Sequence, residues 1–168
     1  EAGTYTFTSS QNISKNITIV GEDGVQFVRG FTGAYGILSP QLGYTLTIDN
    51  IDFIGNDAGY AIDMVEGSTL TVTNSSFTNF TGGIYVNVGG MLTVSSSTFS
   101  DLAAGIGTDC ATLSLNITGN DFTGLAEAVG FTAPRDTEEN FLAFKAQVIA
   151  DNTDATEANV IAYGTFAS

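Results

Sequence analysis

Histidine is absent from this chain, and basic residues are scarce: four Lys and Arg stand against 18 Asp and Glu, for a formal net charge of −14 over 168 residues. Without histidine there is no Ser-His-Asp triad, no His-containing zinc site and no side chain that titrates near neutral pH in its unperturbed state. Because four basic side chains cannot form a positive surface for a phosphate backbone, we expect no nucleic-acid partner.

Cysteine, tryptophan and long apolar runs are also scarce or missing. The single cysteine, Cys110, excludes an internal disulfide and a CxxC metal knuckle, and we expect it to fill a small buried space. No apolar run approaches the roughly 20 residues of a membrane span, so we expect no membrane insertion of this segment. Charged residues make up only 13%, and Thr, Ser, Asn and 20 glycines take their place. This composition is typical of an all-β protein with many turns.

A repeat of 22–24 residues organises the chain. In four segments a Leu is followed seven residues later by a Phe, and then by a third apolar anchor that comes after small residues. The Leu–Phe pairs are Leu46 and Phe53, Leu70 and Phe77, Leu92 and Phe99, and Leu115 and Phe122, and the third anchors are Ile62, Ile84, Ile106 and Val129. Three short apolar clusters per period, separated by turn residues, predict one coil of a parallel β-helix.

We therefore expect an all-β fold: a right-handed parallel β-helix with three strands per coil and five to six coils, whose like anchors stack in interior columns. One domain would cover residues 1–168, with regular coils over about 17–131 and an irregular C-terminal coil or cap over 132–168. Ile37 would be the third anchor of an early coil. Because a free β-helix end exposes unpaired strand edges, we expect this module to be cut from a larger surface protein.

The segment 137–150 has two interpretations. Leu142 and Ile149 keep the seven-residue spacing and favour a strand, with Val160 and Ile161 in a last strand. A helix from Thr137 is the alternative, because Glu138 and Glu139 would lie in its first turn ahead of an apolar run.

The repeat Leu-Thr-(Ile/Val)-x-(Asn/Ser)-x-x-Phe resembles the right-handed parallel β-helix surface proteins. Phe53-Ile54-Gly55-Asn56 matches the FxxN step of adhesin-like and polymorphic-membrane-protein repeats, and Gly82-Gly83-Ile84 is a shortened form of their second motif. The segment Asn16-Ile17-Thr18-Ile19-Val20-Gly21 also resembles the first coil of many β-helices of the pectate-lyase-like superfamily. The resemblance covers roughly residues 4–131 and implies the fold, which hosts both polysaccharide enzymes and non-catalytic surface proteins.

An enzyme of that superfamily would need a cluster of calcium-binding acids and a basic residue. The only basic residues are Lys15, Arg29, Arg135 and Lys145, all outside the central coils. The best acidic cluster is Asp49, Asp52, Asp57 and Asp63, which either bind Ca²⁺ or act as turn acids that bond their own backbone. We expect no catalytic residue and no cofactor unless Ca²⁺ binds here.

Outward positions on the first strand of each coil form a hydroxyl-rich face. As candidate ligand-binding residues we take Thr47, Thr69, Thr71, Thr73 and Thr93, together with the outward-facing Tyr85. Either the threonines simply suit a strand and pair their hydroxyls across it, or the face contacts a glycan, a protein or an ordered lattice. Tyr60 is a further aromatic candidate, placed at a turn.

We expect a non-catalytic, adhesin-like module at the cell surface or secreted. It would bind a glycan or a surface protein of a host or neighbouring cell, or act as a spacer that carries other domains of the same polypeptide. The alternative is a polysaccharide lyase or hydrolase of the pectate-lyase-like class.

Overall fold

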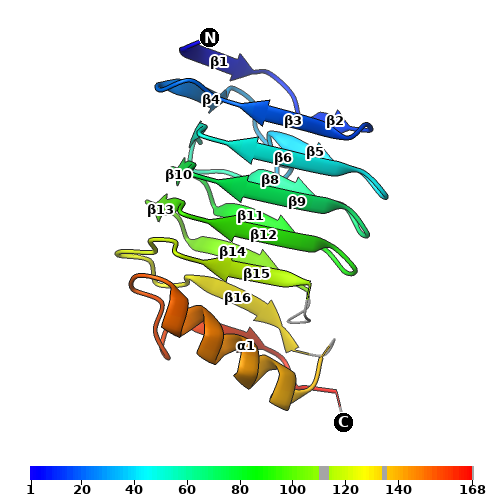
Figure 1. Ribbon diagram of the computed structural model, residues 1–168, viewed down its shortest axis with the longest axis vertical. Coiled ribbons are helices and arrows are strands. Elements are labelled where there is room, and N and C mark those ends of the chain that lie inside the picture. Colours follow the sequence, from blue (N-terminus) through cyan, green and yellow to red (C-terminus); the bar gives the residue numbers. More distant parts are fainter. Residues whose placement is uncertain (110–113, 134–135, 168) are drawn as a thin grey trace.

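The computed structural model describes residues 1–109, 114–133 and 136–167. Its strands wind into a parallel β-helix of about five turns, in which each full coil adds one strand to each of three sheets (Figure 1). The predicted fold class is confirmed. Cys110 and Arg135 lie outside the described residues.

The three parallel sheets run along the long axis of the molecule. Sheet A contains β1 (Gly3–Phe7), β4 (Val25–Arg29), β7 (Asp52–Ile54), β10 (Ser76–Thr78) and β13 (Thr98–Ser100). Sheet B contains β2 (Gln11–Ile13), β5 (Leu38–Pro40), β8 (Tyr60–Met64), β11 (Gly82–Val86), β14 (Ala104–Thr108), β16 (Val129–Thr132) and β17 (Val160–Tyr163). Sheet C contains β3 (Ile17–Val20), β6 (Thr45–Asp49), β9 (Thr69–Thr73), β12 (Met91–Ser95) and β15 (Leu115–Thr118).

The repeat anchors stack in register inside the helix. The Leu column runs from Leu46 through Leu70 and Leu92 to Leu115, and the third anchors pair from Ile62 to Val129. The phenylalanines form a continuous stack with ring centroids 4.8–5.5 Å apart, made of Phe27, Phe53, Phe77, Phe99 and Phe122. All three predicted columns are confirmed, and together they make one core.

Small residues ahead of the third anchors make room for the phenylalanine rings. An ideal Cβ at Gly83 would lie 2.8 Å from Cδ1 of Phe99, and one at Gly105 would lie 2.9 Å from Cδ1 of Phe122. The repeat therefore needs a small residue at this point because the neighbouring ring already occupies the space.

The turns from sheet C to sheet A use the left-handed backbone region and a buried polar ladder. Asn50 and Asn74 have φ of 58° and 51°, which asparagine tolerates better than most residues. Inside the turns, the Ser97 amide donates to Oδ1 of Asn120 at 3.0 Å, and the Asn120 amide donates to Oδ1 of Asn152 at 2.9 Å. The ladder thus satisfies backbone donors that the turns would otherwise leave unpaired.

Of the two interpretations of residues 137–150, the helix from Thr137 is confirmed and the strand is wrong: Glu138–Asp151 form helix α1, which covers the C-terminal end of the β-helix (Figure 1). Thr137 caps the helix by accepting from the Asn140 amide at 3.3 Å. Helical spacing buries Phe141, Phe144 and Val148, whereas Leu142 is 54% exposed. The seven-residue spacing that favoured a strand equals two helical turns just as well.

Two polar side chains close the open edge of β15 under the helix. Gln147 and Asn152 both donate from their amide groups to the Ile117 carbonyl, at 3.2 and 2.8 Å. The last strand predicted at Val160 and Ile161 is present as β17.

Two boundaries also differ from expectation. Leu38, not Ile37, pairs with Ile62, although both residues are buried. Regular pairing begins at Gly3, in β1, well before residue 17. Within the described residues, no helix is both long and apolar enough to cross a membrane.

The phenylalanine stack should dominate stability. Phe77→Ala removes a fully buried ring between two stacked neighbours, so we expect the free energy of unfolding to fall by about 3–5 kcal/mol. Urea denaturation followed by circular dichroism measures the change. Tyr35→Ala is the matched control, because Tyr35 is 70% exposed and should cost no more than about 0.5 kcal/mol. Equal losses in both variants would contradict a core built on the stack.

Candidate functional site

The predicted threonine face lies on the outside of sheet C. Thr47, Thr71 and Thr93 pair in one column across β6, β9 and β12, with Thr69 and Thr73 on either side in β9. The Thr73 hydroxyl donates to Asp49 at 2.7 Å. This bond joins β9 to β6 across the strands, as expected if the hydroxyls of this face pair with neighbouring strands.

The four acids predicted as a calcium cluster are not brought together. Asp49 and Asp52 lie on strands of different sheets, Asp57 lies in a turn with φ of 61°, and Asp63 lies on β8 in sheet B. Asp49 accepts from Thr73 and Asn74, and these hydrogen bonds lower its pKa. Among the residues described, no group of three or more His, Cys, Asp and Glu could hold a metal ion.

Tyr85 does not belong to the threonine face, because it projects from sheet B. There it borders a hollow of about 230 Å³ on the outer surface of β8, β11, β14, β16 and β17. We call this the tyrosine hollow, and its principal residues are Tyr60, Tyr85, Gly107, Glu127, Gly130 and Tyr163. Tyr60, expected at a turn, is the first residue of β8.

Glycines on neighbouring coils create the hollow. Tyr60 pairs with Gly82, and an ideal Cβ on that glycine would lie 2.5 Å from Cε1 of the tyrosine ring. Tyr85 pairs with Gly107, where a Cβ would lie 3.2 Å from Cδ2 of the ring. Each ring therefore leans along the axis over the glycine of the next coil, and their centroids are 5.3 Å apart.

Carboxylates hold two of the phenols in place. The Tyr85 hydroxyl donates to Oδ1 of Asp109 at 3.0 Å, and the Tyr163 hydroxyl donates to Glu127. Burial and then the bond to Asp109 raise the pKa of Tyr85 to about 12, while the bond to Glu127 and then burial raise the pKa of Tyr163 to about 12. Both phenols therefore stay protonated at neutral pH and act as hydrogen-bond donors.

The pKa values of the third phenol and of a neighbouring acid are also raised. Burial, Asp63 and Glu127 together raise the pKa of Tyr60. Burial raises the pKa of Asp63, which pairs in register with Tyr85. No lysine or arginine is among the described residues that line the hollow. The described lining thus combines tyrosine rings with the carboxylate of Glu127.

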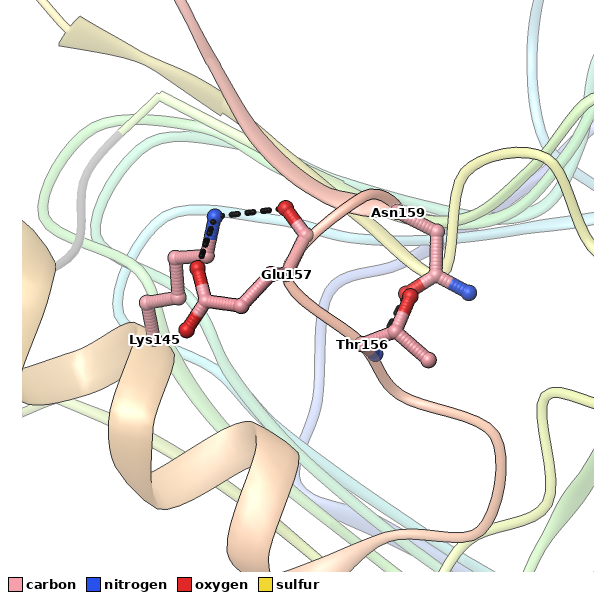
Figure 2. A network of polar contacts seen from close by, with 4 residues as sticks. All are labelled: Lys145, Thr156, Glu157 and Asn159. Carbon is pink, nitrogen blue, oxygen red and sulfur yellow. Dashed lines mark hydrogen bonds and ion pairs between the residues drawn. The ribbon is translucent and has the colours of Figure 1, made fainter.

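The basic residues that are described have structural roles or lie away from the hollow. Arg29 is buried, donates to the Gly33 carbonyl at 2.7 Å and sits 3.9 Å above the Phe31 ring, so it fixes the expanded loop. Lys145 on α1 donates to the Glu157 carbonyl at 2.8 Å and pairs with its carboxylate at 3.0 Å (Figure 2). Neither offers a free base of the kind that a lyase would need.

The C-terminal loop that these contacts hold leads into β17. Beside Glu157, the Thr156 amide donates to Oδ1 of Asn159 at 2.7 Å (Figure 2). Asn159 is buried and also donates to the Asp154 carbonyl at 2.8 Å. This network fixes the entry to the strand that carries Tyr163.

Sequence reasoning missed the hollow, although part of its signal is visible. Gly107 and Gly130 occupy outward strand positions where a threonine or another β-former is usual, and such glycines mark a close approach by another group. The strand that carries Tyr163 was predicted at Val160 and Ile161, but no pattern in the sequence connected Tyr163 with the hollow.

Comparison with protein-family models, with curated proteins and with solved structures found no match.

The pKa of Tyr163 should depend on its hydrogen bond to Glu127. With a pKa of about 12 against a usual value of 10, its stabilising contribution is complete below about pH 10 and is lost as pH rises towards 12. Glu127→Ala removes the hydrogen-bond acceptor, which is the largest cause, so we expect Tyr163, and to a lesser extent Tyr60, to ionise at lower pH in a tyrosinate absorbance titration. Tyr163→Phe identifies the contribution of Tyr163. Identical curves for wild type and Glu127→Ala would show that the bond is absent.

Proposed function

We propose that this protein is a non-catalytic carbohydrate-binding module of the adhesin-like kind, working at the cell surface or secreted, and that the tyrosine hollow is its binding site. The observation that carries the proposal is the set of three tyrosines that line one hollow on the outer face of sheet B. The faces of a sugar ring carry C–H groups that pack on aromatic rings, while its hydroxyls bond to polar groups at the rim.

The dimensions suit a sugar unit within a longer chain. A volume of about 230 Å³ is below the roughly 300–1,000 Å³ of pockets that enclose drug-sized ligands. One sugar ring would pack against the exposed parts of the tyrosine rings, and the neighbouring units would extend over the open surface of sheet B. A shallow, open site of this kind fits a polymer better than an isolated small molecule.

The site is held rigid before a ligand arrives. Tyr85 and Tyr163 are fixed both by their sheet positions and by their bonds to Asp109 and Glu127. The bond to Tyr163 also orients the Glu127 carboxylate, which lines the hollow and can accept from a sugar hydroxyl. Because little side-chain freedom is lost on binding, weak contacts can add up to measurable affinity.

The acid–base properties of the side chains that line the hollow favour a binding role over catalysis. The phenols have pKa values too high for a base near neutral pH, and the described lining has no basic residue. The −14 net charge and the single cysteine agree with an extracellular setting.

A glycan array with three proteins tests the proposal. We expect saturable wild-type binding that weakens about ten-fold in Tyr85→Ala, the effect of losing roughly 1.4 kcal/mol of aromatic contact. Thr71→Lys, on the outer face of sheet C, should bind like wild type. Circular dichroism and thermal melting of each variant confirm that it is folded.

Other outcomes would overturn the proposal in distinct ways. Loss of binding in Thr71→Lys but not in Tyr85→Ala would move the site to the threonine face. Absence of binding to any glycan would leave a spacer or a protein-binding module. Release of shorter sugars from a bound polysaccharide would establish a lyase or hydrolase instead.

A further inference from the structure

We infer that the N-terminal end of the β-helix binds a second copy of this chain, end to end, so that the protein is a two-fold symmetric dimer in solution. The contact surface is the first coil, residues 1–21, whose strands β1, β2 and β3 are the terminal strands of sheets A, B and C. Figure 1 shows these strands together at one end of the molecule and helix α1 at the other. The described chain therefore covers one end of its core and leaves the opposite end open.

The hydrophobic core extends into the open coil. Phe7, Ile13 and Ile19 pack against the core and are only partly buried. The other nine residues of β1, β2 and β3 are exposed. Ile17 is 36% exposed, whereas Leu46, its register partner one coil further in, is fully buried. A covering layer would bury these side chains and pair the free backbone groups of three strand edges at once.

The three edge strands lack the features that keep sheet edges from pairing. Exposed edges of monomeric proteins are usually protected by lysine, by proline or by inward-pointing charges. The strands have the sequences Gly-Thr-Tyr-Thr-Phe, Gln-Asn-Ile and Ile-Thr-Ile-Val, without a charged residue or a proline. Edges of this composition are suited to pair with the strands of another chain.

The charge distribution allows a second copy to approach at this end. Residues 1–21 contain one acid, Glu1, and one base, Lys15, so the net charge of −14 is carried by the rest of the chain. Two copies would repel each other along their sides but not where their first coils meet. The opposite end is acidic by contrast, with Glu138 and Glu139 in the first turn of α1.

The aromatic column of sheet A ends in a residue that suits an interface. Tyr5 pairs in register with Phe27, is 45% exposed and donates its hydroxyl to the Glu1 carbonyl at 3.1 Å. The rings stacked below Phe27 are all phenylalanines, which need no hydrogen-bond partner. Tyrosine combines an apolar ring with a polar tip and is enriched where two chains meet. This change favours a contact between chains over a continuation of the same repeat.

A two-fold axis through β2 fits the shape of the open end. One coil passes through β1, β2 and β3 in turn while it advances by one strand spacing, so its end is a ramp with β2 at the middle height. Rotation about an axis through the middle of β2, perpendicular to the sheet, places β2 against its copy and β1 against the other copy's β3. The gap between the copies is then the same in all three sheets, and every pair is antiparallel.

The side chains brought together by this axis are complementary. Strands β1 and β3 have five and four residues, so they can pair over nearly their whole length. Tyr5 and Phe7 of one copy would lie opposite Ile17 and Ile19 of the other. Aromatic residues opposite β-branched residues are a favourable cross-strand combination.

Association of this kind stops at two copies. The contact uses both open ends, and α1 covers the two ends that remain, so the assembly closes and cannot grow into a fibre. With residues 1–21 on each side, the contact is at the lower end of the roughly 20–30 residues per side of a stable interface.

The dimer would present both tyrosine hollows on one side. Because the axis is perpendicular to sheet B, the two outer faces of that sheet point the same way, with the hollows roughly 40 Å apart along the rod. This consequence alone rests on the proposed function. One polysaccharide held at two points should bind at least about ten-fold more tightly to the dimer than to a monomeric variant, whereas a short oligosaccharide should bind equally to both.

Sedimentation equilibrium of the 168-residue protein, without sugar, tests the inference. We expect twice the 17.4 kDa mass of one chain. Ile17→Lys places a charge in the contact and should give a monomer. Leu142→Lys is the matched control, because it places the same charge at a 54% exposed position on α1, at the opposite end, and should leave the dimer intact. Circular dichroism checks the fold, and Tyr5→Lys replaces Ile17→Lys if that variant unfolds.

Disulfide trapping tests the position of the axis. Asn12 is the exposed central residue of β2, so Asn12→Cys in a Cys110→Ser background should give a disulfide-linked dimer under mild oxidation. Directly opposite residues of antiparallel strands have Cα atoms about 4.5–5.5 Å apart, within the range that a disulfide spans. Asn74→Cys in the same background, exposed in a turn of an inner coil, should not cross-link.

The contrary results are distinct. A wild type that is monomeric at every concentration would overturn the inference and leave the open end to another segment of the polypeptide or to a different partner. Loss of the dimer in Leu142→Lys but not in Ile17→Lys, or a dimer that Asn12→Cys does not cross-link, would overturn the end-to-end arrangement. Because mass is measured without sugar, a dimer that binds no glycan would contradict the proposed function alone.

Discussion

Parallel hydrogen bonding between successive coils is the constraint on which the rest of this structure depends. Each strand pairs residue for residue with the strand one coil away, so a position in the repeat meets its own equivalent about 4.8 Å above and below. Like side chains then share one environment along the molecule. The phenylalanine stack, the small residues beside it and the turn asparagines all follow from this register.

The tyrosine hollow depends on the same register, but it forms where neighbouring coils carry different residues at outward positions. A tyrosine on one coil leans over a glycine on the next, which neither coil could provide alone. Carboxylates from the adjoining coils then fix the phenols. The core needs the repeat to be regular, whereas the site needs neighbouring coils to differ at outward positions.

This contrast explains how far the sequence could be interpreted. The Leu, Phe and Ile columns were predictable because burial enforces the same residue type in every coil. The spacing of Leu142 and Ile149 could not decide between strand and helix because it fits both structures, and the cap at Thr137 proved the better indicator of helix α1. The hollow could not be derived, since Tyr60, Tyr85 and Tyr163 occupy different positions in their coils and come together only through the register of sheet B.

Because complete coils stack on one another, the unit that can be inserted without disturbing the pairing is one complete coil. Inserting one residue in a strand would turn every later side chain of that strand to the opposite face, but inserting a complete coil would preserve the pairing on both sides. A coil added between β3 and β6 would lengthen the molecule by about 4.8 Å and leave the hollow intact. One added between β11 and β14 would part Tyr85 from Gly107, so this protein has segments that tolerate duplication and a segment that does not.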